Sequence, residues 1–253
     1  MSFLVVKNLL KTFDGITAVN NLSFNVKKND IFAIIGPNGA GKTTTFNLLS
    51  GVLRADRGEI HFNGDPIIGL KPYQIASRGV VRTFQSVNLF DNMTVIDNVK
   101  VGCHKKAQSE IFAAALRTRQ FRQEEQYISR KASDTLRLIG LESRAGEMAG
   151  SLPFGQQRLL EIARSLAGDP ELLLLDEPAA GLNAHETSEL AALILKLQSQ
   201  GITIVIIEHD MELVMEISNN IIVLDQGVKI AEGTPKHIQS NKTVIAAYLG
   251  EEY

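Results

Sequence analysis

The sequence has a single cysteine among 253 residues, Cys103, and no long apolar run. One cysteine excludes an internal disulfide framework and is typical of a reducing compartment. No apolar run approaches the ~20 residues that a membrane-spanning helix requires. The first residues turn polar at Lys7, too soon for a signal peptide. We therefore expect a cytoplasmic protein whose association with a membrane would depend on a partner or a surface patch.

An excess of either charge is also missing, since 26 Lys and Arg stand against 28 Asp and Glu and the net charge is −2. This balance excludes the strongly basic surface of a general nucleic-acid-binding protein, so we expect no nucleic acid among the partners. No group of histidines and cysteines suggests a structural metal. The length and the 44% hydrophobic content predict one large domain, or one domain with an added lobe.

The strongest motif follows the pattern G-x-x-x-x-G-K-[ST] of a phosphate-binding P-loop. Its residues are Gly36, Pro37, Asn38, Gly39, Ala40, Gly41, Lys42, Thr43 and Thr44. The apolar run 31–35 predicts a buried parallel strand before the loop, and 43–50 predicts a helix after it. Inward-facing N–H groups and the helix N-terminus favour an anion. Lys42 would reach the β- and γ-phosphates and Thr43 would bind Mg²⁺; a chance glycine-rich loop is the alternative.

Two carboxylates end a second apolar strand. Asp176 and Glu177 follow the four leucines at 172–175, a run typical of a strand buried on both faces. Buried charge is costly unless it is paired or bound to a metal. Asp176 fits the role of a Walker B aspartate, which contacts Mg²⁺ either directly or through a bound water, and Glu177 fits the orientation or deprotonation of a water. An acidic strand end without chemistry is the alternative.

Two more polar residues end predicted strands. Gln85 follows a strand at 80–84, and His209 follows one at 201–207. Ligands of open α/β sheets bind at the carboxyl ends of the strands, so both side chains are expected at the same edge as Asp176. Gln85 would touch a metal or a water, and His209 would sense the γ-phosphate. A polar exit residue and a structural histidine are the alternatives.

The amino-terminal part predicts β structure, with strands in 3–9 and 18–26 and a turn at 12–15. Phe13 lies in this turn, and it is either a core residue or a platform on which a purine ring stacks. A further strand is expected at 57–64, bounded by turn glycines.

The middle of the chain is different, because 94–140 lacks strand signals and predicts helices at about 94–103, 107–120 and 122–139. Its basic residues are compatible with a membrane or nucleic-acid surface, but interspersed glutamates favour a solvated helix face. Gly155 precedes a helix expected at 157–166 and would offer a second anion site, although alone it is an ordinary loop residue.

In their order, these motifs resemble those of the ATP-binding-cassette (ABC) ATPases, and the resemblance covers essentially the whole chain. The sequence of the motifs is similar to that of the ATPase subunits of branched-chain amino-acid importers. The passages that carry it are 154–158, 159–164, 176–183, 207–211 and 247–250. The resemblance implies an ATP-binding and ATP-hydrolysing importer subunit with ATP and Mg²⁺ as ligands.

The fold implied by the resemblance is an α/β P-loop NTPase core with a mixed sheet, an amino-terminal antiparallel β region and an inserted α-helical subdomain. The chain would be a single ABC ATPase domain over 1–253. Residues 1–85 and 151–253 would form the nucleotide-binding core, and 86–150 the α-helical subdomain.

The resemblance also implies roles for single residues. Phe13 would stack on adenine, and residues 36–44 would hold the phosphates. Thr43, Gln85 and Asp176 would hold Mg²⁺, and Gln85 would also link the site to the membrane partner.

Catalysis is assigned by the same resemblance to Glu177 as the catalytic glutamate, His209 as the switch histidine and Lys42. Gly155 and Gln156 match the signature motif, which closes on ATP held by the other subunit. The common signature Leu-Ser-Gly-Gly-Gln is replaced here by the sequence Leu-Pro-Phe-Gly-Gln at 152–156. Proline has neither a hydroxyl nor an N–H, so the usual serine contact to the γ-phosphate is in doubt and the two sites of a dimer would be unequal.

The partners implied are integral-membrane permease subunits, a second ATPase subunit that is identical or related, and indirectly a solute-binding protein, at the cytoplasmic face of the inner membrane. Another cargo, such as urea, an amide or a lipid, is an alternative. A soluble ABC protein and a P-loop kinase are less favoured, since the first usually has two cassettes or a long coiled coil and the second would not explain Gln156 or His209.

Overall fold

The computed structural model describes residues 2–83, 88–103 and 119–249. The chain forms two compact units, one made of residues 1–82 and 171–253 and the other of residues 83–170. Within the described ranges, every helix is too short or too polar to traverse a lipid bilayer.

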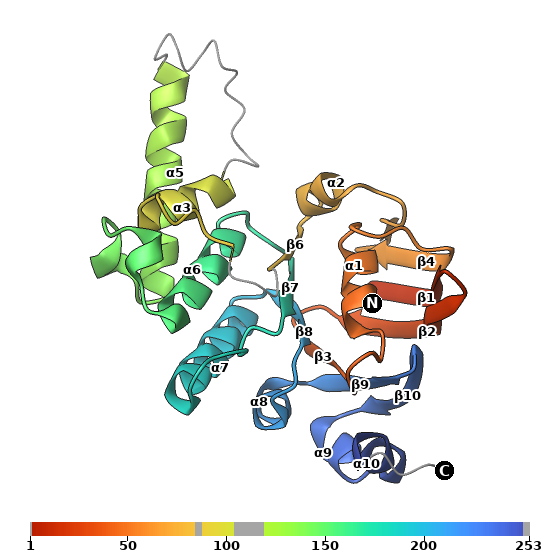
Figure 1. Ribbon diagram of the computed structural model, residues 1–253. Helices are drawn as coiled ribbons and strands as arrows, with labels where there is room; N and C mark the ends of the chain where they lie inside the picture. Colours follow the sequence, from red (N-terminus) through yellow and green to blue (C-terminus); the bar gives the residue numbers. More distant parts are fainter. Residues whose placement is uncertain (1, 84–87, 104–118, 250–253) are drawn as a thin grey trace. The chain divides into compact units, whose positions relative to one another are not determined.

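The first unit contains a six-stranded mixed sheet, which can be followed in Figure 1. Its order is β10-β9-β3-β8-β7-β6, and neighbours pair in parallel except for β10, which is antiparallel to β9. The strands are β3 Ile31–Ile35, β6 Val80–Arg82, β7 Leu172–Asp176, β8 Thr203–Ile207, β9 Asn220–Asp225 and β10 Val228–Gly233. The mixed sheet predicted from the sequence is confirmed.

The central strands of this sheet place three loops together. Strands β3, β7 and β8 are buried along their whole length, as expected for parallel strands covered on both faces. Strand β8 pairs in parallel with β3 on one side and with β7 on the other. The loops that leave the carboxyl ends of these strands therefore meet at one edge of the sheet.

A four-stranded antiparallel sheet forms the amino-terminal part of the same unit, with the order β2-β1-β4-β5. Its strands are β1 Ser2–Phe13, β2 Ile16–Lys27, β4 Arg57–Phe62 and β5 Asp65–Pro66. The β1–β2 hairpin turns at Asp14 and Gly15, both with positive φ, 45° and 87°. Asp and Gly tolerate this backbone region, which a tight turn requires.

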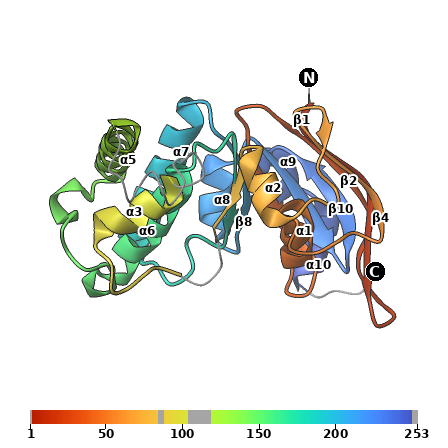
Figure 2. The ribbon, with the colours of Figure 1, turned by 90° about the horizontal axis from the view of Figure 1, so that it is seen from above.

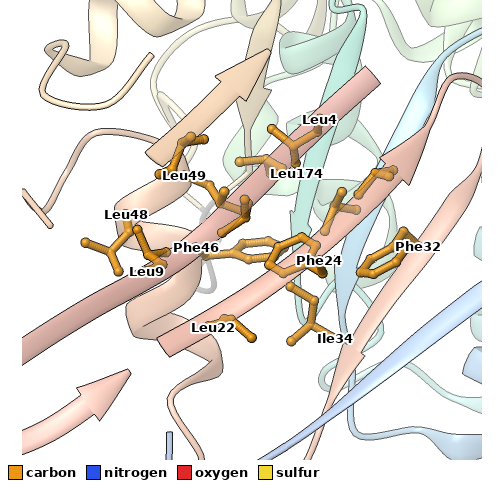
Figure 3. Close-up of a cluster of buried hydrophobic side chains, with 14 of the residues drawn as sticks. Leu4, Leu9, Leu22, Phe24, Phe32, Ile34, Phe46, Leu48, Leu49 and Leu174 are labelled. Carbon is orange, nitrogen blue, oxygen red and sulfur yellow. The ribbon is translucent and has the colours of Figure 1, made fainter. Parts of the chain in front are cut away.

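The core of the first unit draws side chains from both sheets and from helix α1 Lys42–Leu49 (Figure 3). Phe24 of β2 stacks on Phe32 of β3, with ring centroids 5.3 Å apart. Phe46 and Leu49 of α1 are fully buried in the same cluster. Helix α1 is thereby held by apolar packing along its length, and its first turn is fixed relative to both sheets.

The remaining helices of the first unit follow the sheet strands in the chain. They are α2 Pro72–Ser77, α7 Ala184–Ser199, α8 Met211–Ile217, α9 Pro235–Gln239 and α10 Lys242–Leu249. Helices α9 and α10 both lie beside β10 (Figures 1 and 2).

The second unit is helical in its described part. Its helices are α3 Val95–Cys103, α5 Arg119–Leu138 and α6 Phe154–Leu166, with short 3₁₀ turns at Glu142–Arg144 and Ala149–Ser151. Helix α3 packs against α5 and α6. Most of the helix expected at 107–120 lies outside the described residues.

Helix α6 begins three residues earlier than the start expected at 157. Pro153 is its N-cap with φ −53° and ψ 149°, and proline's fixed φ and missing N–H suit the residue just before a first turn. The contacts of α6 group it with the helical unit, which extends to residue 170, whereas the sequence placed 151–253 in the core. The functional division into core and subdomain stays a prediction.

Candidate functional site

The phosphate loop requires glycine at two positions because neighbouring backbone lies against it. Gly36 has φ 148°, and a Cβ there would lie 2.0 Å from the Leu224 carbonyl oxygen. Gly41 has φ 96°, and its Cβ would lie 2.3 Å from the Ala18 carbonyl oxygen. Both conformations are in the region that only glycine adopts without strain. The loop therefore has no space for a side chain at these two positions.

The first turn of α1 presents the groups that an anion needs. Its N-cap is Gly41, no side chain caps it, and no acidic residue lies in the first turn. Unsatisfied N–H groups and the helix dipole at such a terminus favour negative charge. Thr43 is exposed in this turn and Thr44 is half-buried.

Lys42 is the charged group of the loop. It is only 5% exposed, and its Nζ donates hydrogen bonds to the carbonyl oxygens of Gly36 at 2.7 Å and Pro37 at 2.9 Å. Burial lowers the pKa of Lys42, and the Glu177 carboxylate opposes this shift. The amine is thus held against the loop, within electrostatic reach of a second predicted site residue.

Asp176 ends β7 as predicted, and it is 1% exposed. Its Oδ2 accepts a hydrogen bond of 2.7 Å from Nη2 of Arg82, in a buried ion pair. Nη1 of Arg82 donates to Asn47 Oδ1 at 2.7 Å and to Ser50 Oγ at 3.0 Å, both on or next to α1. Sequence reasoning missed Arg82, although an arginine inside an otherwise apolar strand is a detectable signal.

Glu177 and His209 meet at the edge of the sheet. Nε2 of His209 lies 2.6 Å from Oε1 of Glu177. Glu177 has φ 47°, an unusual value for a residue with a side chain, and its N–H donates to the Ile207 carbonyl at the end of β8. The left-handed backbone turns the chain immediately after β7. The structure therefore brings together two of the predicted catalytic residues.

Glu208 is a further residue that the sequence analysis missed as a site element. It is 3% exposed and accepts hydrogen bonds from the N–H groups of Ala179 at 2.7 Å and His209 at 3.0 Å. Burial raises the pKa of Glu208, and these backbone hydrogen bonds oppose the shift. Its carboxylate joins the loop after β7 to the loop after β8, and so fixes the backbone that carries Glu177 and His209.

Phe13 lies at the tip of the β1–β2 hairpin and is 41% exposed, so it is not a core residue. Nζ of Lys11 lies 5.2 Å from the centroid of its ring. The exposed ring fits the second interpretation, a stacking platform.

The remaining predicted residues lie elsewhere. Gly155 is buried and Gln156 is half-buried in the first turn of α6, in the helical unit. A buried ion pair in the same helix joins Arg158 Nη1 to Glu161 Oε2 at 3.0 Å, which sequence reasoning also missed. Gln85 lies outside the described residues.

The residues present fit a nucleotide and Mg²⁺. The uncapped α1 terminus and the Lys42 amine are suited to a phosphate chain, and the two glycines let the loop backbone pack closely against the carbonyls of Leu224 and Ala18. Mg²⁺ prefers oxygen ligands and commonly takes one or two from the protein and the others from phosphates and water. The Thr43 hydroxyl and the Asp176 carboxylate are oxygen donors of this kind.

A glycine loop between a buried strand and a helix, with acidic and histidine side chains after the neighbouring strands β7 and β8 of the same sheet, defines a P-loop nucleotide-binding protein. The ABC transporter family model matches residues 19–180. A second model, described as branched-chain amino acid ATP-binding cassette transporter, matches residues 228–253. The chain belongs to the ABC transporter family, and it is an ABC ATPase.

Curated relatives are similar over almost their full length. The chain is 46% identical to the high-affinity branched-chain amino acid transport ATP-binding protein BraF of Pseudomonas aeruginosa, covering 98% of each chain. It is 47% identical to LivG of Escherichia coli, which has the same description, again over 98% of each.

Solved structures agree with the fold. The ADP conformation of the ABC-transporter cassette MJ1267 has a TM-score of 0.86 at 32% identity, with 99% of this chain and 100% of that chain covered. A dimeric post-hydrolysis state of the cassette MJ0796, bound to ADP and Pi, has a TM-score of 0.77 at 25% identity, with 92% and 98% covered. The predicted ABC ATPase fold is confirmed.

Proposed function

We propose that this chain is the ATP-hydrolysing subunit of an importer for branched-chain amino acids. The observation that carries the proposal is the 46–47% identity, over 98% of each chain, to ATP-binding proteins described as serving high-affinity branched-chain amino acid transport. The match of the carboxyl-terminal 228–253 to a model of that transporter class supports the same cargo.

In this proposal ATP supplies the γ-phosphate group, and Mg²⁺ supplies positive charge that neutralises the negative charge of the phosphates. The Lys42 amine, now on two neutral loop carbonyls, would bind the charged phosphates in their place. Thr43 and Asp176 would contribute the protein oxygens for Mg²⁺. Gln85, outside the described residues, would be a further ligand and the link to the membrane partner, as the resemblance implies.

The water is positioned by Glu177, whose carboxylate is oriented by the 2.6 Å contact with His209. A base held by a second side chain is ordered before the substrate arrives, which lowers the entropic part of the barrier. His209 would stabilise the charge that develops on the γ-phosphate.

The proposal includes a second ATPase subunit, identical or related, in an ATP-bound dimer. Gly155 and Gln156 of one chain would close on ATP held by the P-loop of the other, where a helix N-terminus favours the anion. The dimer of the similar cassette MJ0796 supports this arrangement. The resemblance to branched-chain amino-acid importers favours a heterodimer, and Pro153 in the signature would make its two sites unequal.

Permease subunits would complete the assembly, with this chain on the cytoplasmic face of the inner membrane and a solute-binding protein on the other side. Binding of ATP would close the dimer and hydrolysis would open it.

The chemistry and the cargo are tested together by Glu177→Gln. We expect this variant to bind ATP as wild type does and to remain as an ATP-bound dimer. Its rate of phosphate release should fall roughly 100-fold or more. In host cells that lack the chromosomal copy, wild type should restore uptake of labelled leucine and the variant should not. Glu212→Gln, which changes an exposed carboxylate on α8, is the matched control. Normal hydrolysis by Glu177→Gln would contradict the assigned base, and leucine uptake independent of the chain would contradict the cargo.

A further inference from the structure

The carboxylate of Asp56 accepts several hydrogen bonds from residues near the end of strand β1. Its Oδ2 accepts hydrogen bonds from the N–H of Thr12 at 2.7 Å and from the Thr12 hydroxyl at 2.8 Å, and its Oδ1 accepts one from Nζ of Lys11 at 2.9 Å. The N–H of Asp56 also donates to the Leu10 carbonyl at 2.9 Å. The hydrogen bonds with Lys11 and Thr12 lower the pKa of Asp56 to about 2, so the carboxylate is charged near neutral pH.

These contacts hold the two residues that come directly before Phe13. The Lys11 amine bonds to Asp56 and also lies 5.2 Å from the centroid of the Phe13 ring. The β1–β2 ladder is irregular in this region, because its register shifts between Leu9 and Lys11 and again between Lys11 and Thr12 before Phe13 pairs with Ile16. Asp56 therefore adds to this irregular ladder three hydrogen bonds from a different segment of the chain.

The segment that carries Asp56 follows α1, the helix that comes after the phosphate loop. Helix α1 starts at Lys42 and ends at Leu49, and the chain then runs over a few residues to Asp56 before β4 begins at Arg57. The carboxylate thus joins Lys11 and Thr12, the residues before Phe13, to the segment between α1 and β4.

We propose that Asp56 is a positioning residue for recognition of the nucleotide base: it fixes the Phe13 ring at the orientation and distance from the phosphate loop at which a purine stacks. This inference rests on the proposed function, in which Phe13 is the adenine platform. A ring that is already ordered loses less conformational freedom when the base binds, so the clamp contributes to affinity without touching the ligand.

The test compares Mg·ADP with Mg·pyrophosphate, which share a two-phosphate chain and differ by the adenosine, on the full chain by titration calorimetry. Asp56→Ala should weaken ADP binding roughly five- to tenfold, part of a stacking contribution, and leave pyrophosphate binding within about twofold of wild type. In steady-state hydrolysis the variant should raise KM for ATP with little change in kcat, as expected when ground-state binding is lost.

Two further variants keep the test decisive. Thr12→Val removes one of the donated hydrogen bonds and keeps the side-chain shape, so it should show a smaller loss in the same direction even if Asp56→Ala folds poorly. Asp65→Ala removes an exposed carboxylate from β5 of the same sheet and should leave both ligands unaffected.

Phe13→Ala separates failure of this inference from failure of the proposed function. Weaker ADP binding in Phe13→Ala, with no further loss in the double variant Phe13→Ala/Asp56→Ala, supports the clamp. Weaker binding in Phe13→Ala together with unchanged binding in Asp56→Ala and Thr12→Val overturns it. Unchanged ADP binding in Phe13→Ala shows instead that the ring is not the base platform, and equal losses for ADP and pyrophosphate in Asp56→Ala would overturn the inference by assigning Asp56 to the phosphate loop.

Discussion

Arg82 connects the helix of the phosphate loop to the buried carboxylate at the end of β7. One nitrogen of its guanidinium bonds to Asp176 and another bonds to Asn47 and Ser50. The fixed planar geometry of arginine suits this double contact, which lysine could not reproduce. The side chain is 9% exposed and that of Asp176 is 1% exposed, so each charge depends on its environment for compensation.

Arg82→Met should therefore destabilise the fold strongly. Breaking a buried ion pair costs ~3–5 kcal/mol because one charge stays buried without its counter-ion. Urea unfolding followed by circular dichroism, since the chain has no tryptophan, measures the change. The double variant Arg82→Met/Asp176→Asn should lose less than the sum of the two single changes, and Arg54→Met, at an exposed position, should change the stability by no more than ~0.5 kcal/mol. Additive losses would contradict the coupling.

At the level of secondary-structure elements, the β3–loop–α1 segment is held by close contacts of the backbone at Gly36 and Gly41. Gly39 lies in the same loop with φ 82°, but a Cβ there would have no neighbour within 4 Å. The two glycines Gly39 and Gly41 therefore separate the cost of a left-handed backbone from the cost of a steric clash.

Gly41→Ala should lose more stability than Gly39→Ala, by at least ~2 kcal/mol, because its Cβ would lie 2.3 Å from a backbone oxygen that cannot move freely. Gly39→Ala should show only the left-handed strain of ~1–2 kcal/mol. ADP binding should fall further in Gly41→Ala than in Gly39→Ala. Equal unfolding free energies for the two variants would show that the loop rearranges to accept a side chain at Gly41, and would contradict the close contact with the Ala18 carbonyl.

The elements themselves follow closely from the sequence. Apolar runs predicted β3, β7 and β8. Helix α6 was expected too late because Gly155 indicated a loop, whereas packing within the helical unit buries that glycine in the first turn. Arg82 and Glu208 were missed as site elements because their roles come from hydrogen bonds across the fold, to residues 94 and 29 positions away, which no local pattern records.

On the scale of the entire chain, the residues predicted to contact the nucleotide come from both units. The P-loop, Asp176, Glu177 and His209 belong to the unit with the two sheets, and the signature residues Gly155 and Gln156 belong to the helical unit. In the proposed ATP-bound dimer these two sets would act on the same nucleotide only when they come from different subunits. ATP binding would therefore be linked to association, and the ligand would stabilise the dimer by mass action.

The most direct test of the account is purification of this chain from its native membrane in mild detergent, with identification of the proteins that accompany it. The account predicts two permease subunits and an ATPase subunit, either a related chain or a second copy of this one, in an assembly that binds a branched-chain amino-acid binding protein. Recovery of the chain in a soluble complex with ribosomes or DNA, and with no membrane protein, would contradict the importer while leaving the ATPase site in place.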